Sequence, residues 1–80
     1  MNINSIKEKI ENFISNSRVE VKDTTGTGDH FSVLVISDHF KNMNLVNRHK
    51  LIYESLNQYI TKEIHALQIK ACTEEELSNV

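Results

Sequence analysis

The chain has 80 residues, enough for one domain, with 39% hydrophobic and 25% charged residues and a formal net charge of −2. This composition excludes a disordered chain, and the longest apolar run, residues 33–36, excludes a membrane-spanning helix, which needs about 20 apolar residues. Nine basic residues against eleven acidic ones give no overall electrostatic attraction for the phosphates of nucleic acid.

The first predicted element is an amphipathic helix over residues 4–15. Its apolar residues recur at the spacing of one helix face, and polar side chains fill the positions between them. Ser5 followed by Glu8 matches a capping box, which satisfies otherwise unpaired backbone amides at a helix start. The apolar positions are Ile3, Ile6, Ile10, Phe13 and Ile14.

Two strands and a loop are predicted next. Val19 and Val21 alternate with polar residues, the period of two that indicates a half-buried strand. The segment 23–29 holds both glycines of the chain and is the natural loop. Residues 31–37 are apolar at nearly every position and predict a central strand, antiparallel to the first.

The remaining predicted elements are a loop, a long helix, a strand and a short terminal helix. Residues 38–44 are polar and predict the loop, and apolar residues at helical spacing predict a second helix over residues 45–60. Apolar and polar residues alternate over 67–71, which predicts the third strand. Thr73 and Glu76 form another capping box, which opens the terminal helix.

These elements predict an α+β fold that occupies residues 1–80 as a single domain. A helix that connects two strands of one sheet in a crossover makes them parallel, so the sheet should be three-stranded and mixed. We expect both main helices to pack on one face of this sheet. The polar strand residues expected on the other face are Glu20, Lys22, Gln68 and Lys70.

Four histidines and one cysteine are the soft or borderline metal ligands of the chain. Their spacing matches none of the strong zinc patterns, because no Cys-x-x-Cys or His-x-x-x-His pair is present and no third ligand lies nearby. A complete metal site is therefore not predicted, whereas an incomplete site finished by a partner protein stays open.

Two of the histidines flank the predicted sheet. His65 lies at the entry to the third strand, where its side chain can project from the sheet edge; the alternative is a ring nitrogen bonded to a backbone carbonyl. His30 ends the glycine-containing loop, with an exposed loop residue as its alternative role. If the first and third strands both flank the central one, the two histidines can be neighbours, although the sequence does not fix their distance.

The other candidate ligands are weaker. His49 falls on the apolar stripe of the second helix, which favours a satisfied, partly buried histidine, and His39 is expected to be solvated. Cys72 is expected to be a small, partly exposed packed residue, with a ligand role as the lesser alternative. A single cysteine also excludes an internal disulfide and suits a reducing compartment.

No pattern in the sequence supports catalysis. It has no nucleophile elbow and no Cys–His pair, and the segment 26–29 lacks the lysine and the spacing of a phosphate-binding loop. A domain of 80 residues also offers little concave volume for a substrate. We therefore expect a protein that is not an enzyme.

Several segments together resemble the BolA family. They are Gly28–Ser37 with Phe40, then Asn47–Tyr53, and finally Ile64–Leu67 with Thr73–Glu75. Each motif alone is weak, but the Arg-His-Lys motif of the second segment combined with the later Ile-His-Ala-Leu is fairly specific. The similarity covers nearly the whole chain.

The resemblance implies a BolA-like fold related to the class II KH fold, with the long helical region divided in two. It also implies a partner, because BolA-like proteins associate with monothiol glutaredoxins and the pair can share a 2Fe–2S cluster bound with glutathione. The family's C-terminal histidine, matched by His65, is the expected cluster ligand. His30 matches the second ligand proposed for the family's histidine-type subgroup. No cofactor is expected in the isolated protein.

The expected function is thus a non-enzymatic role in iron–sulfur cluster assembly, trafficking or iron sensing. Exchanging a thiolate for a histidine makes a cluster less negative and raises its reduction potential, as in Rieske centres. We expect a cytoplasmic protein, because Glu8 and Glu11 interrupt any secretory signal. An organellar stroma or matrix is the alternative if the chain is a trimmed precursor.

Two alternative functions stay open. In the first, the chain is a DNA-binding transcriptional regulator whose helix-turn-helix-like region uses Lys41, Arg48 and Lys50. RNA binding of the KH kind is not expected, because the segment 41–44 has no glycine for a Gly-x-x-Gly clamp. In the second, the chain is an adaptor that docks a partner through the same surface without holding metal.

Overall fold

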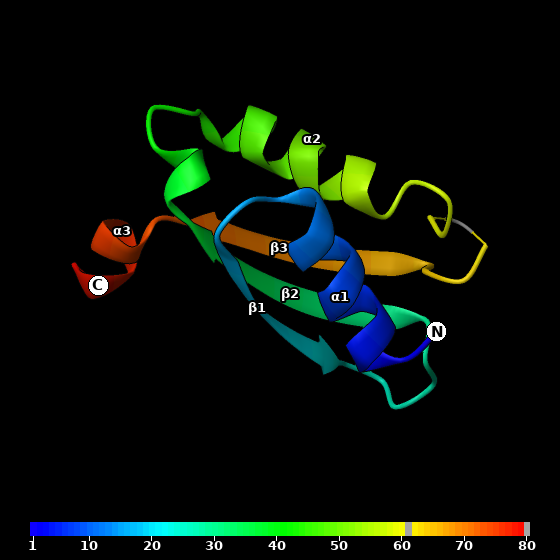
Figure 1. Cartoon of the computed structure of the whole chain (residues 1–80). Coiled ribbons are helices and arrows are strands. Elements are labelled where there is room, and N and C mark those ends of the chain that lie inside the picture. The colour runs from blue at the N-terminus through cyan, green and yellow to red at the C-terminus, as the bar shows by residue number, and fades with distance from the viewer. Residues whose placement is uncertain (61, 80) are drawn as a thin grey trace.

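The computed structural model describes residues 1–60 and 62–79 and has the predicted α+β class (Figure 1). None of the helices in these two ranges is long and apolar enough to cross a membrane. The elements in chain order are α1 (Ile3–Phe13), β1 (Ser17–Asp23), β2 (His30–Ser37), the 3₁₀ turn η1 (Asp38–Phe40), α2 (Leu45–Ser55), β3 (Ala66–Cys72) and α3 (Glu74–Ser78).

The sheet is three-stranded and mixed, with β2 in the centre. β1 runs antiparallel to β2, in a register that pairs Val19 with Val35. β3 runs parallel to β2 and pairs Leu67 with Phe31, after the chain has crossed over through α2. Both predicted strand directions are therefore confirmed.

α1 and α2 pack on the same face of the sheet, as expected (Figure 1). Alternate residues of a strand point to opposite faces, so one set of β2 side chains enters the core beneath the helices. The core residues that α1, β2, α2 and the C-cap of α2 contribute are Ile6, Ile10, Phe31, Val33, Val35, Ile52 and Leu56, each at most 2% exposed. The four polar strand residues predicted for the other face are all exposed.

α1 differs from its prediction at both ends. The expected capping box at Ser5 is wrong, because Asn2 caps the helix and its side-chain oxygen accepts a hydrogen bond from the Ser5 amide at 2.8 Å. Ser5 consequently lies inside the first turn. The helix ends at Phe13 rather than residue 15, since Ile14 adopts extended backbone and its carbonyl accepts a hydrogen bond from the Ser17 hydroxyl at 2.8 Å.

The helix predicted over residues 45–60 is too long, because α2 ends at Ser55. Turns follow it, in which the Leu56 amide donates to the Tyr53 carbonyl at 3.1 Å and the Tyr59 amide donates to the Leu56 carbonyl at 2.9 Å. Such turns keep apolar residues at nearly helical spacing, so periodicity does not distinguish them from a helix. The predicted loop 38–44 contains η1, so the short helical element precedes α2 and does not come from a division within residues 45–60 as the family resemblance implied.

α3 begins with the predicted capping box. The Thr73 hydroxyl accepts the Glu76 amide at 3.1 Å, and the Glu76 carboxylate accepts the Thr73 amide at 2.8 Å. Arg48 on α2 is buried, and its guanidinium donates to the two Glu76 oxygens at 2.6 and 3.0 Å and to the Ala71 carbonyl at 3.2 Å. This ion pair ties α3 to both α2 and β3.

Candidate metal-ligand site

The parallel pairing of β2 and β3 brings His30 and His65 to one corner of the sheet. His30 opens β2 and lies opposite Ala66, the first residue of β3, so His65 directly precedes that pair. The ring centroids of the two histidines are 6.3 Å apart and their planes are inclined by 57°. The distance that the sequence left open is therefore that of neighbouring side chains.

Asp29 lies between the two rings. Its Oδ1 is 2.7 Å from Nδ1 of His30, and its Oδ2 is 3.9 Å from Nδ1 of His65. The Thr27 hydroxyl and then His30 lower the pKa of this carboxyl, which is consequently ionised at neutral pH. A carboxylate bonded to Nδ1 leaves Nε2 of His30 free to bind a metal ion, the arrangement that orients histidine ligands in metal sites, whereas the His65 ring is beyond hydrogen-bond distance of Asp29.

The backbone around Asp29 fixes this arrangement. Its carbonyl accepts a hydrogen bond from the His65 amide at 2.7 Å, which joins the loop to the entry of β3. The carboxylate of Asp23 closes the other side of the loop by accepting the Gly26 amide at 2.8 Å and the Gly28 amide at 2.9 Å. Both glycines have φ near +76°, which glycine adopts without the strain of a side chain.

Both histidine side chains are open to another molecule. The His30 side chain is 40% exposed and that of His65 is 55% exposed. Among the hydrogen bonds of residues 1–60 and 62–79, none joins the His65 ring to a backbone carbonyl, the structural role weighed for it above. His65 therefore has the accessible ring that a ligand role needs.

The spacing of the rings suits a single metal ion. Two imidazoles on one tetrahedral ion, with metal–nitrogen bonds of about 2.0–2.1 Å, have centroids roughly 5 Å apart. The observed distance between the ring centroids is 6.3 Å. Side-chain rotations that shorten it by about one ångström therefore allow both rings to bind the same ion.

The pair is nevertheless only part of a coordination sphere. Within the described ranges, no group of three or more His, Cys, Asp or Glu side chains could hold a metal ion. The donor set fits a metal centre that a second molecule completes, which is the incomplete site that the sequence left open.

The remaining candidate ligands lie away from this corner. Cys72 is at the other end of β3, on the order of 20 Å from His65 along the strand. It is buried, at 7% exposure, rather than partly exposed as expected, and burial raises the pKa of its thiol. A protonated buried thiol is a poor ligand. His39 is exposed in η1 and His49 is partly buried on α2, as expected.

The three residues considered for contacts with DNA or a partner differ in exposure. Lys41 and Lys50 are exposed, whereas Arg48 is buried and uses four of its N–H donors on Met43, Ala71 and Glu76. The first helix of the expected helix-turn-helix region is η1, which has only three residues. Arg48 thus has a structural role, and the positive charge available to phosphates in this region comes from the two lysines.

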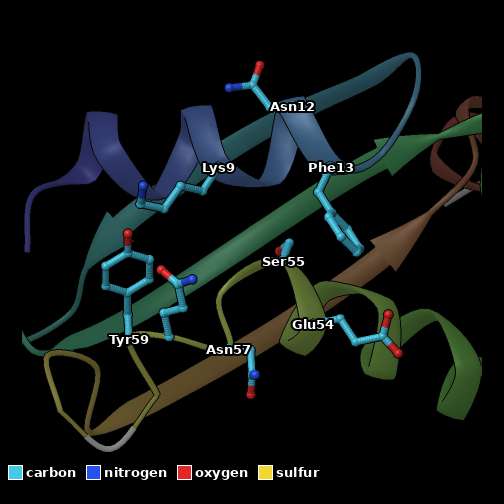
Figure 2. A pocket seen from close by; sticks show the side chains of 8 residues that line it. Lys9, Asn12, Phe13, Glu54, Ser55, Asn57 and Tyr59 are labelled. Carbon is cyan, nitrogen blue, oxygen red and sulfur yellow. The ribbon is translucent and has the colours of Figure 1, made fainter.

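Two hollows lie near the end of α2. A groove of ≈ 410 Å³ separates α1 from the end of α2, and Figure 2 shows Lys9 and Tyr59 turned toward each other across it. The Lys9 Nζ lies 4.8 Å from the Tyr59 ring centroid. None of the candidate ligands lines this groove, whereas His65 adjoins a smaller apolar recess of ≈ 100 Å³ whose other lining residues include Tyr53, Ile60, Ile64 and Leu67.

The sequence singled out both histidines as candidate ligands but did not point to the Asp29 carboxylate beside them. The available signal was the acidic residue immediately before a candidate ligand, Asp29 before His30. The burial of Arg48 had no local signal, because its partner Glu76 lies 28 residues further along the chain.

Fold and site together define a small α+β protein that presents two histidines at one corner of a mixed sheet, with no third potential ligand grouped with them among the described residues. Comparison with known proteins supplies the family. A family model described as BolA-like protein matches residues 2–76, so the chain belongs to the BolA-like family and the resemblance is confirmed. No enzyme family is indicated by this match.

Individual relatives agree with this assignment. BolA-like protein 1 of Mus musculus is 32% identical over 76 residues, which cover 86% of this chain and 56% of that protein. The DNA-binding transcriptional regulator BolA of Haemophilus influenzae is 41% identical over 51 residues, which cover 64% of this chain and 50% of that protein. The chain thus spans about half the length of these curated relatives.

The fold is also that of solved structures in the family. The structure of a bolA protein homologue from Coxiella burnetii matches with a TM-score of 0.82 at 33% identity. The match covers 98% of this chain and 97% of that one.

Proposed function

We propose that this chain is a non-enzymatic partner of a monothiol glutaredoxin and shares a 2Fe–2S cluster with it in iron–sulfur cluster assembly, trafficking or iron sensing. The observation that carries the proposal is the pair of accessible imidazoles at one sheet corner. Asp29 bonds Nδ1 of His30 and leaves its Nε2 to an incoming metal centre, and the exposed His65 ring lies beside the same carboxylate.

The chemistry of this pair complements that of a thiol partner. The glutaredoxin cysteine and the glutathione thiolate supply anionic sulfur. His30 and His65 of this chain supply imidazole nitrogen. Nitrogen in place of sulfur raises the reduction potential of such a centre. The cluster is then cargo shared between two proteins rather than a resident cofactor of this one.

The cysteine of the chain suits the same setting. Cys72 is a free thiol, buried in the fold, and free thiols persist in reducing compartments. We propose the cytoplasm as the site of action.

The proposal is tested by reconstituting the cluster with a monothiol glutaredoxin and glutathione under anaerobic conditions. Visible absorption, circular dichroism and cluster lifetime are compared for the unchanged chain and for His65→Ala and His30→Ala. We expect both substitutions to alter the spectrum and shorten the lifetime while the far-ultraviolet circular dichroism stays unchanged. His39→Ala is the matched control, an exposed histidine elsewhere that should leave all three readouts unchanged.

Other outcomes of this experiment favour the other functions. A complex that forms with unchanged spectra in both variants supports an adaptor that docks without holding metal. Failure of the unchanged chain to bind the glutaredoxin contradicts the proposal altogether.

DNA binding is the second candidate because a relative carries the name of a DNA-binding regulator. In this chain, the net charge of −2 and the buried Arg48 leave Lys41 and Lys50 as the phosphate contacts of the region. Two such contacts predict a slope of roughly −2 for the logarithm of affinity against that of salt concentration. A much steeper slope together with sequence preference would favour the regulator.

A further inference from the structure

We propose that, without another partner, two copies of this chain bind one borderline divalent transition-metal ion, such as Zn²⁺, between their His30–His65 pairs. A second copy of the chain then supplies the two ligands that the first copy lacks. This inference uses the same two rings as the proposed function but does not depend on a glutaredoxin or on a cluster.

The number of donors leads to this stoichiometry. Zinc in closed protein sites takes four ligands in a tetrahedron, and each chain offers two imidazoles whose centroids are already 6.3 Å apart. The described part of the chain contains no cluster of three potential ligands, so the missing donors come from outside. A two-fold axis through the ion gives each copy the same contacts, which is the usual symmetry of a homodimer.

The charges around the rings match a divalent cation. Imidazole ligands add no charge to a metal centre, so a divalent ion keeps its charge of +2. The two copies contribute one Asp29 carboxylate each, with a charge of −1. Each carboxylate lies 2.7 Å from Nδ1 of His30, in the carboxylate–histidine–metal arrangement that raises the basicity of the ligand. The charges of one ion and two carboxylates cancel.

The donor type selects the class of metal. Imidazole suits zinc, copper, nickel and cobalt, whereas magnesium and calcium prefer oxygen ligands. Access is open as well, because both rings are 40% or more exposed and the residue beside them, Ala66, is small and exposed.

The test titrates zinc sulfate into the full chain without a histidine tag. Calorimetry counts the bound ions, and size-exclusion chromatography with light scattering measures the mass. We expect saturation at one ion per two chains and a doubling of the mass. Cobalt chloride in place of zinc should give the intense visible absorption of a tetrahedral Co²⁺ centre.

Variants decide which residues are responsible. His30→Ala and His65→Ala should each abolish the mass doubling and the tetrahedral cobalt spectrum, whereas His39→Ala should retain both. Saturation at one ion per chain without dimerisation overturns the proposal, as does mass doubling that survives either substitution. Since no glutaredoxin is present, failure here leaves the cluster proposal standing, and failure of cluster reconstitution leaves this one standing.

Discussion

Asp29 lies beside both candidate ligands. Its carboxylate lies on the Nδ1 side of both His30 and His65, and its backbone carbonyl holds the His65 amide. Asp29 thus bonds the His30 ring through its side chain and the His65 backbone through its carbonyl. We propose Asp29 as the positioning residue of the site.

Replacing this carboxylate tests that role. Asp29→Asn keeps the shape of the side chain but removes its charge, so both ligands remain while their orientation and basicity weaken. We expect metal or cluster retention to fall by about 10- to 100-fold, the usual effect of such a substitution. The measurement is cluster lifetime in the complex reconstituted with a glutaredoxin.

A matched control separates this effect from a general loss of negative charge. Asp38→Asn removes a carboxylate from an exposed position in η1, and it should leave the lifetime unchanged. Equal lifetimes for Asp29→Asn and the unchanged chain would show that the carboxylate does not position the rings.

At this scale the sequence pointed to candidate ligands but not to their geometry. His30 and His65 could be selected because histidine is a metal ligand and each lies next to a predicted strand. Their separation depends on how β2 and β3 pair, and the role of Asp29 depends on that same pairing. Local sequence carries neither piece of information.

Among the secondary-structure elements, α3 takes part in an exposed ion pair, Arg18–Glu74, and in a second one, Arg48–Glu76, whose guanidinium is buried. Arg48, followed by the Thr73 amide, lowers the pKa of Glu76 from its ordinary 4.5 to about 2. Because this pKa is depressed in the folded state, the stabilisation is complete above about pH 4.5. It is lost as the pH falls from there toward 2, where the carboxylate becomes protonated.

Urea unfolding of the unchanged chain and of Glu76→Gln at a series of pH values tests this contribution of the Arg48–Glu76 ion pair. We expect the unchanged chain to have the larger free energy of unfolding above pH 4.5, and this difference to shrink as the pH falls toward 2. Glu75→Gln is the control, since Glu75 is exposed on the same helix. A difference between the unchanged chain and Glu76→Gln that stays constant across this window would contradict the assigned ion pair.

The elements show where sequence patterns are sufficient and where they fail. The alternation over β1 and β3 and the apolar run of β2 predicted the strands. The crossover through α2 predicted that β2 and β3 run parallel. The capping box at Thr73 was also correct, because side chain and backbone meet within four residues. The capping box at Ser5 was wrong because Asn2, one turn earlier, is an equally good cap and starts the helix first.

The topology of the whole molecule creates the site. Two parallel neighbouring strands begin at the same edge of a sheet, so the residues that enter β2 and β3 meet at one corner. The sequence predicted this parallel pair through the crossover helix. The structure adds that the corner is exposed and that residues 1–60 and 62–79 bring no group of three potential ligands together. We therefore propose that a metal centre at this corner is completed by another molecule.

Pulsed electron paramagnetic resonance on the reduced cluster tests this account most directly. The cluster is reconstituted between a monothiol glutaredoxin and this chain, in which only the histidines of this chain carry ¹⁵N. We predict hyperfine couplings from coordinated nitrogen that change with the isotope and are reduced in His65→Ala. A spectrum that is the same with ¹⁴N and ¹⁵N histidine would contradict the account, because no imidazole of this chain would then be bound to iron.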